Sequence, residues 1–343
     1  MKYFKFFTYI SLIFLFTSCI KQQQDLITIN GNTMGTYFIV NIVNPPLNIT
    51  KDRLKKEIED VLINVNQKMS NWDKQSEISL LNSRKSLAPI KISDDLTSLI
   101  NAANKIHRES KGFLDITLDP LIDLWGFGYN NKIKKVPSDR NIQKTLKFVN
   151  QEKLLKLDVK NKLITKLNVE VSMNLSSIAK GYGIDMIGKK LEAIGIKNFL
   201  IDIGGDILTK GLNSKNDEWI IGIENPDLKE KLIKEIVNIS NKSIATSGDY
   251  KNYYIEKGIQ YSHILNPKSG KPIKHSTKSV TIIHNTAMEA DGWATAFLAM
   301  GSQKGLKLAE EKNIAALFID KINNKLIKIK TTKFKNLKKV KIE

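Results

Sequence analysis

Hydrophobic and polar residues alternate between positions 26 and 43, and Gly31 and Gly35 interrupt the alternation. This pattern predicts a β-hairpin that ends at the two prolines at 45 and 46. From 54 to 69 apolar residues recur at helical spacing, which predicts an amphipathic helix. Ser93 is placed to cap a second helix, whose apolar face runs from Leu96 to Ala103.

The same reading continues along the rest of the chain. It predicts helices at 177–194 and 288–300, and strands at 199–203, 218–223, 234–239, 279–284 and 314–319. It predicts an irregular segment at 113–129, a polar peripheral segment at 130–165, and a tail at 325–341 whose Lys–Ile alternation suits a strand with one solvated face. Strands and helices mix without a βαβ rhythm, so we expect an α+β fold of mixed β-sheets with packed helices. At 343 residues, we expect one large lobe or two fused lobes.

Composition narrows the class of protein. The chain is 41% hydrophobic and 26% charged, which excludes wholesale disorder. The formal net charge is +19, and this excess could favour nucleic acid or anionic lipid. Lysines are spread along the whole chain, however, and no nucleic-acid-binding motif accompanies them, so we expect no nucleic-acid partner.

The first 19 residues, MKYFKFFTYISLIFLFTSC, have the layout of an export signal. Two lysines precede a short apolar run, and small residues precede Cys19, which is the only cysteine. Cys19 resembles the lipidated position of a bacterial lipoprotein signal; the alternative is an uncleaved anchor with an incidental cysteine. We expect a signal peptide at 1–18, a tether at 19–25 from lipidated Cys19, and an exported, lipid-anchored body at 26–340 facing the periplasm or cell exterior.

Two polar segments suit phosphate or a close ligand approach. Residues 174–185 place a polar turn and Lys180 at a predicted helix start, where free N–H groups favour phosphate. An ordinary serine-capped helix is the alternative. Residues 201–206 form a strand that ends in Gly204 and Gly205, which would let a ligand approach the backbone or would simply make a tight turn.

Two further segments suit proton transfer and metal binding. His263 precedes a turn rich in proline and glycine, although a single histidine is more often structural. Asp291 and Thr295 lie four residues apart, so a helix would place both on one face. Their oxygens could bind Mg²⁺; alternatively, Asp291 caps the helix and Thr295 bonds to a backbone carbonyl.

Taken in order, these segments resemble the ApbE family of FAD:protein FMN transferases, over about residues 27–335. The resemblance also rests on Thr33-Met-Gly-Thr36, Ser70-Asn-Trp-Asp73, Gly112-Phe-Leu-Asp-Ile-Thr117, Leu124-Trp-Gly-Phe-Gly128 and Ala245-Thr-Ser-Gly-Asp-Tyr250. It implies an ApbE, or T-fold-like, architecture. It also implies Mg²⁺-dependent transfer of the FMN portion of FAD to a Thr or Ser hydroxyl of an exported acceptor protein, with release of AMP.

Roles for individual residues follow from the resemblance alone. It implies that His263 is the general base and that the Asp291 and Thr295 side chains bind Mg²⁺ with the backbone carbonyls of Ser177 and Ala294. The positions that it implies for FAD contact are Met34, Trp72, Phe113, Leu114, Asp115, Asn174, Lys180 and Leu265. Relatives often carry Asp where Asn174 stands. A Mg²⁺-dependent FAD pyrophosphatase and a non-catalytic flavin-binding lipoprotein remain alternatives.

Overall fold

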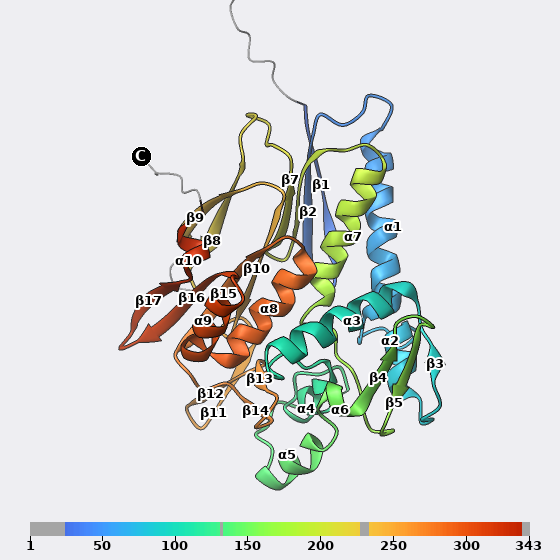
Figure 1. The fold of residues 1–343 in the computed structure, drawn as a ribbon, viewed down its shortest axis with the longest axis vertical. Coiled ribbons are helices and arrows are strands. Elements are labelled where there is room, and N and C mark those ends of the chain that lie inside the picture. The colour runs from blue at the N-terminus through green and yellow to red at the C-terminus, as the bar shows by residue number, and fades with distance from the viewer. Residues whose placement is uncertain (1–24, 131–132, 227–232, 338–343) are drawn as a thin grey trace, which may run out of the picture.

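The computed structural model describes residues 25–130, 133–226 and 233–337 (Figure 1). Its strands are β1 Leu26–Thr33, β2 Thr36–Val43, β3 Ile90–Lys91, β4 Leu155–Asp158, β5 Leu163–Lys166, β6 Asn198–Ile203, β7 Asp206–Lys210, β8 Trp219–Glu224, β9 Ile233–Ile239, β10 Lys242–Gly248, β11 Tyr253–Glu256, β12 Ile259–Ser262, β13 Leu265–Asn266, β14 Lys271–Pro272, β15 Thr277–His284, β16 Ala315–Ile322 and β17 Lys325–Lys330. Its helices are α1 Lys51–Met69, α2 Glu77–Ser83, α3 Asp94–Glu109, the 3₁₀ helix η1 Ile116–Leu118, α4 Asp119–Leu124, α5 Asp139–Leu146, α6 Gln151–Leu154, α7 Ala179–Ala193, α8 Ala287–Met300, α9 Ser302–Glu311 and α10 Thr332–Lys335.

An eight-stranded sheet in the order β1-β2-β6-β7-β10-β15-β16-β17 forms the centre of the molecule. Every neighbouring pair in it is antiparallel. The predicted hairpin at 26–43 is confirmed as β1 and β2. The α+β class with packed helices is also confirmed. The strand pairs that the structure describes are all antiparallel, so the expected mixed sheets are antiparallel sheets instead.

Helices cover one face of this sheet, and a small two-stranded sheet covers the other. Helices α1, α7, α8 and α9 lie along the first face (Figure 1). On the opposite face, Trp219 of β8 and Val237 of β9 join Phe334 of α10 in a buried cluster with side chains from the central sheet. Inner strands of the sheet such as β16 are therefore buried on both sides, which explains the continuous apolar run Ala315–Ile319, whereas the edge strands β1 and β17 are partly exposed.

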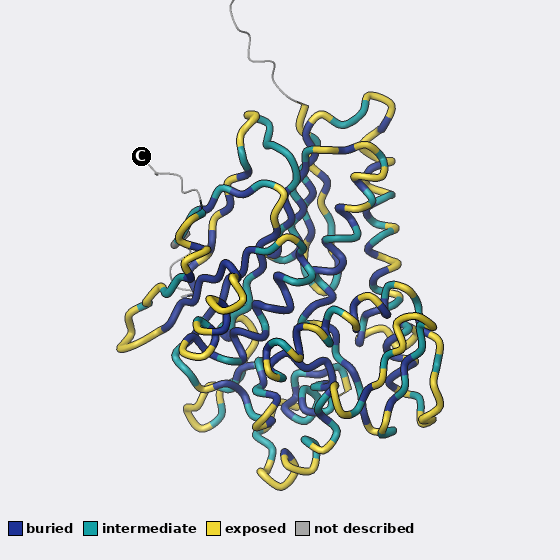
Figure 2. Tube along the Cα trace, viewed as in Figure 1, coloured by how far each residue is buried: buried dark blue, intermediate teal, exposed yellow. Residues whose placement is uncertain are grey.

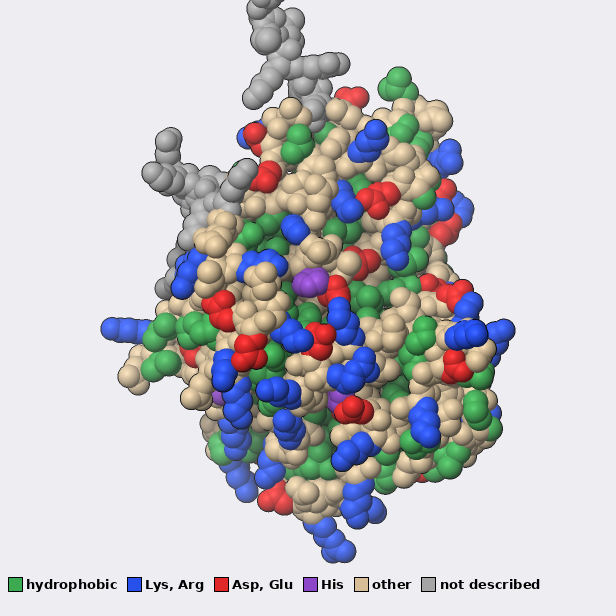
Figure 3. Space-filling model, viewed as in Figure 1, with side chains coloured by type: hydrophobic (Ala, Val, Ile, Leu, Met, Phe, Trp, Pro, Cys, Tyr) green, Lys and Arg blue, Asp and Glu red, His purple; other side chains and the backbone are tan. Residues whose placement is uncertain are grey.

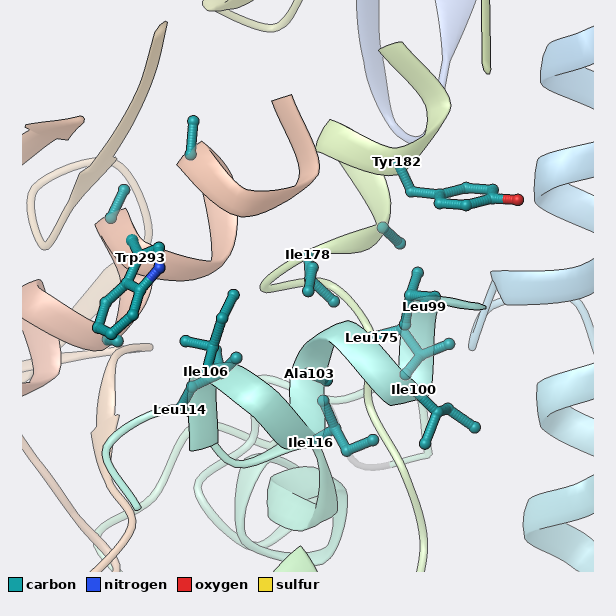
Figure 4. Close-up of a cluster of buried hydrophobic side chains, with 14 of the residues drawn as sticks. Leu99, Ile100, Ala103, Ile106, Leu114, Ile116, Leu175, Ile178, Tyr182 and Trp293 are labelled. Atoms are coloured by element: carbon teal, nitrogen blue, oxygen red, sulfur yellow. The ribbon is translucent and has the colours of Figure 1, made fainter. Parts of the chain in front are cut away.

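Residues 77–173 form a second lobe below the sheet, but they do not have a separate core. Ile106 of α3 lies between Trp293 of α8 and Ile178, and Leu99 of α3 lies beside Leu175 (Figure 4). These residues belong to one buried cluster that continues into β10, β15 and β16. Figure 2 shows the same buried path running from the sheet into the lower lobe. The two lobes are thus fused through a shared core.

Side-chain caps explain where helices α1 and α3 begin. Thr50 accepts a hydrogen bond from the Arg53 N–H at 3.2 Å and starts α1. Ser93 accepts from the Leu96 N–H at 3.2 Å and starts α3, as predicted. Such caps satisfy N–H groups that have no partner within the helix.

Three stretches differ from the sequence prediction. The predicted tail strand ends at Lys330, because Thr331 caps α10 and the fully buried Phe334 anchors that helix. Segment 113–129 is not irregular throughout, since it contains η1 and α4. Helix α7 begins at Ala179, two residues later than predicted.

Within the residues that the structure describes, no helix is long and apolar enough to cross a bilayer. The predicted signal peptide, Cys19 and most of the tether lie outside the described residues.

Candidate active site

A cavity of about 510 Å³ opens where the lower lobe meets the helices and the ends of the sheet strands. Side chains from distant parts of the sequence line it. Within the described ranges, every predicted site residue except Ala294 contributes to the lining: Met34, Trp72, Phe113, Leu114, Asp115, Asn174, Ser177, Lys180, His263, Leu265, Asp291 and Thr295. The structure therefore brings together residues that are up to 261 positions apart in the sequence, counted from Met34 to Thr295.

Helix α8 supplies the acidic part of the cavity. Asp291 and Thr295 both face the cavity, one helical turn apart. The Asp291 side chain is buried, and its Oδ2 accepts a hydrogen bond from the Gly181 N–H at 3.0 Å. The Thr295 hydroxyl lies 3.1 Å from the Ser247 hydroxyl. Asp291 therefore contacts the start of α7 rather than capping its own helix, a role that belongs to Thr286.

Close packing of α7 against α8 fixes this arrangement. A Cβ atom on Gly181 would lie only 2.2 Å from the carbonyl oxygen of Ala287, so only glycine fits. Asp185, one turn further along α7, accepts hydrogen bonds from the N–H groups of Ala287 and Met288 at 2.8 and 2.9 Å. These contacts hold the first turns of the two helices together.

One acidic residue of the site, Asp206 at the start of β7, was not predicted from the sequence. It is buried in the cavity wall, pairs with the Lys180 ammonium, and accepts a hydrogen bond from the Thr246 N–H at 3.1 Å. The signal that could have revealed it is its position directly after Gly204 and Gly205, where a strand turns back into the sheet.

The charges at this end of the cavity are strongly coupled. Burial, followed by repulsion from Asp206, raises the pKa of the Asp291 carboxyl to about 7. Burial alone would lower the pKa of Lys180, but Asp206 and Asp291 outweigh it and hold that pKa above its ordinary value. The buried carboxyl groups of Asp206 and Asp291 thus share the ammonium group of Lys180. A further cation at this end of the cavity would favour the ionised forms of both carboxyl groups.

The donor set around Asp291 fits a hard cation. Carboxylate, hydroxyl and carbonyl oxygens are the ligands that Mg²⁺ prefers, and Mg²⁺ commonly takes only one or two carboxylates together with substrate phosphates. No group of three or more His, Cys, Asp or Glu side chains suited to a metal occurs in the described ranges. A cation beside Asp291 would therefore need the Thr295 hydroxyl, backbone carbonyls and ligand oxygens as well.

His263 lies at another part of the cavity wall, directly after β12. Its Nδ1 is 2.9 Å from the Asn252 carbonyl oxygen, and because a carbonyl can only accept, Nδ1 carries the hydrogen. The lone pair is then on Nε2. Burial lowers the pKa of His263 below its ordinary value, so the ring is neutral at pH 7. A neutral imidazole with its lone pair on Nε2 can accept a proton.

Aromatic side chains also line the cavity. Trp72 is 66% exposed and meets Tyr129 edge to face, with ring centroids 6.4 Å apart. Phe113 is buried, and the Lys268 ammonium lies 4.7 Å from the centre of its ring. Large flat faces beside apolar residues such as Leu265 suit a planar heterocycle.

Two predicted cofactor contacts already have partners within the protein. The Asp115 carboxylate accepts hydrogen bonds from the Thr117 N–H at 2.8 Å and the Gln151 N–H at 3.2 Å. Asn174 donates to Asp119 at 3.0 Å and accepts from the Ser176 N–H at 3.1 Å. Both side chains therefore shape the wall of the cavity. Ala294 lies on α8 but is buried in the shared core, so only its backbone could take part.

Comparison with known proteins places this geometry among flavin transferases. The model of the ApbE family matches residues 34–318. The FAD:protein FMN transferase from Haemophilus influenzae is 33% identical, with 94% of this chain and 94% of the relative covered. The FAD:protein FMN transferase from Vibrio cholerae is 34% identical, with 94% of this chain and 96% of the relative covered. The solved structure of the flavin transferase ApbE from V. cholerae superposes with a TM-score of 0.85 at 33% identity, covering 92% of this chain and 99% of that one. The apo flavinyl transferase ApbE from Pseudomonas stutzeri also gives 0.85, at 31% identity, with 92% and 97% covered.

Proposed function

The chain belongs to the ApbE family and is an enzyme, and from this we propose that it transfers the FMN portion of FAD to a Thr or Ser hydroxyl of an exported acceptor protein, with Mg²⁺ bound and AMP released. One observation carries the proposal. The cavity holds a neutral histidine, a cation-compatible pair on α8 and an aromatic wall. A group-transfer reaction on a flavin nucleotide needs these three components together.

The Asp291 and Thr295 side chains would hold Mg²⁺, together with the carbonyl groups of Ser177 and Ala294. When bound, the ion would neutralise negative charge on the diphosphate of FAD. Lys180 adds a positive charge at the same end of the cavity, and its pairing with Asp206 keeps that charge in place. Trp72, Phe113 and Leu265 would bind the flat rings of the nucleotide.

His263 is proposed as the general base. Its Nε2 takes the proton of the acceptor hydroxyl as the hydroxyl oxygen forms a bond to the phosphorus of the FMN half. The bond from that phosphorus to the bridging oxygen breaks, and its electron pair leaves with AMP. The Asn252 carbonyl holds Nδ1–H throughout and so keeps Nε2 facing the cavity.

The location of the enzyme is also a proposal. We propose an exported protein that is anchored to a bacterial membrane through lipidated Cys19 and faces the periplasm or cell exterior. The pattern of residues 1–19 supports it.

The test mixes the full chain in detergent with FAD, Mg²⁺ and a purified exported redox-pump subunit that carries a candidate acceptor threonine. We expect the subunit to gain the mass of FMN, AMP to appear in equal amount, and EDTA to stop both. Free FMN and AMP with an unmodified subunit would indicate the pyrophosphatase instead. FAD that stays intact and bound would indicate a flavin-binding protein.

A further inference from the structure

The hairpin formed by β11 and β12 leads directly into His263. Ser262 is the last residue of β12, and the N–H of His263 donates to the Asn252 carbonyl oxygen at 3.1 Å. Asn252 immediately precedes β11. The histidine thus closes the base of the hairpin, and the hairpin projects from the residue proposed as the general base.

Stacked aromatic rings hold the inner face of the hairpin in place. Tyr254 and Tyr261 stack with ring centroids 5.4 Å apart, and Tyr261 stacks on Trp125 at 5.6 Å. Phe127 contacts both Tyr254, at 5.5 Å, and His263, at 6.3 Å. The hairpin is therefore a fixed platform, with its position coupled to that of the histidine.

The outer face of the same hairpin is apolar and exposed. Tyr253 and Ile255 alternate with the buried-side residues, and they are 37% and 64% exposed. Ile259, at the start of β12, is 47% exposed. Ile259 pairs with Glu256, however, and therefore lies on the same face as Tyr254 and Tyr261. The outer hairpin face, as we call it, thus consists of Tyr253 and Ile255.

Positive charges border the outer hairpin face. Lys251 precedes β11 and also lines the cavity, while Lys257 occupies the turn between the strands. Neither forms an ion pair with any residue that the structure describes. The nearby acidic groups are engaged, since Glu256 accepts from the Val136 N–H at 2.9 Å and Asp249 pairs with Lys278 at 2.7 Å. Figure 3 shows that Lys and Arg also predominate over the lower left of this view, where Figure 1 places the hairpin.

We propose that the outer hairpin face is the docking surface for the acceptor protein and that it binds an apolar segment flanked by acidic residues. This inference rests on the proposed function, because it requires the acceptor hydroxyl to reach His263. Apolar contact with Ile255 and Tyr253 would supply affinity, and Lys251 and Lys257 would select for negative charge. FAD binds in the cavity, which Lys251 lines but Tyr253, Ile255 and Lys257 do not, so substitutions at Ile255 and Lys257 test docking apart from nucleotide binding.

The test measures transfer to the same redox-pump subunit at increasing subunit concentration, with the full chain in detergent and saturating FAD and Mg²⁺. Ile255→Glu should raise the apparent KM for the subunit about tenfold or more and leave FAD binding unchanged. Lys257→Glu changes an exposed turn, where folding is not at risk. It should raise the apparent KM for the subunit several-fold at low salt and by less at high salt. Matched controls are Ile220→Glu, since Ile220 is 57% exposed on the two-stranded sheet β8–β9, and Lys325→Glu, beside the turn that precedes β17.

Each outcome decides between the two proposals. Raised KM in both hairpin variants, with controls like the unmodified enzyme, supports the docking surface. KM values within twofold of the unmodified enzyme, equal effects in the controls, or a fall in kcat alone would overturn the docking surface while the transferase stands. Absence of transfer in the unmodified enzyme would instead refute the proposed function.

Discussion

Gly181 offers a sharp test of how α7 and α8 build the site. Replacing a helical glycine by alanine ordinarily stabilises a protein by about 1 kcal/mol. Here the added Cβ would lie 2.2 Å from the Ala287 carbonyl oxygen and 2.5 Å from its carbonyl carbon, whereas ordinary contacts begin at 3.4 Å. The two helices would have to separate by about 1 Å, since these are backbone atoms of a close-packed interior and cannot rotate away.

The cost of Gly181→Ala has two parts. Overpacking typically costs about 1–3 kcal/mol. Separating the helices also breaks the 3.0 Å hydrogen bond from the Gly181 N–H to Asp291. At a pH above the Asp291 pKa of about 7 the carboxylate is charged, and a bond to a charged group contributes about 1.5–3 kcal/mol. After subtracting the gain in helix propensity, we expect a net loss of about 1.5–5 kcal/mol in the free energy of unfolding.

Urea denaturation of the variant and of Gly183→Ala would check this value. Gly183 lies two residues along the same helix, but its added Cβ would meet the flexible end of Met34 at 2.9 Å. We therefore expect Gly183→Ala to change stability by less than about 1 kcal/mol. If Gly181→Ala proves as stable as Gly183→Ala, the proposed role of helix packing in placing Asp291 is wrong.

Three further predictions concern the site and the anchor. His263→Ala should lower the transfer rate by about 10² or more while FAD stays bound, as measured by single-turnover kinetics and flavin fluorescence. Burial lowers the His263 pKa, and only the neutral ring accepts a proton. The transfer rate that depends on His263 should therefore fall only when the pH drops below the ordinary histidine pKa of about 6.5. His263→Ala should not show this fall. Asp291→Ala should remove the Mg²⁺ dependence of turnover in a metal titration; a variant with an unchanged Mg²⁺ response would exclude Asp291 as a ligand. Cys19→Ser should release the protein from membranes in a fractionation assay, and continued lipid labelling of that variant would contradict the anchor.

Periodicity predicted the elements whose burial is one-sided and regular. Helices α1 and α3 have clear apolar faces and serine or threonine caps, so they could be read from sequence. Strand β10 could not, because its residues Ser243 and Thr246 are polar even though it lies inside the sheet, where the Thr246 hydroxyl meets that of Thr281 at 2.8 Å. Cross-strand pairing of this kind depends on a partner 35 positions away.

Some residues of the candidate site could likewise be predicted from the sequence, and others could not. Spacing alone placed Asp291 and Thr295 on one helical face, because the two residues share one helix. Asp206 and Asn252 were missed because their importance comes from tertiary contacts, to Lys180 in one case and to the ring of His263 in the other. The resemblance supplied most of the remaining wall, and those residues do meet in one cavity.

The shared core of the two lobes has a consequence for how fast a nucleotide can reach the cavity. Because α3 packs into the same buried cluster as α8 and the sheet, the lobes cannot swing apart without breaking that cluster. Domain hinges move on microsecond to millisecond timescales, whereas exposed side chains rotate within nanoseconds. Rotation of Trp72, which lines the cavity and is largely exposed, would then be the main motion that admits FAD, and the association rate should approach the limit set by diffusion.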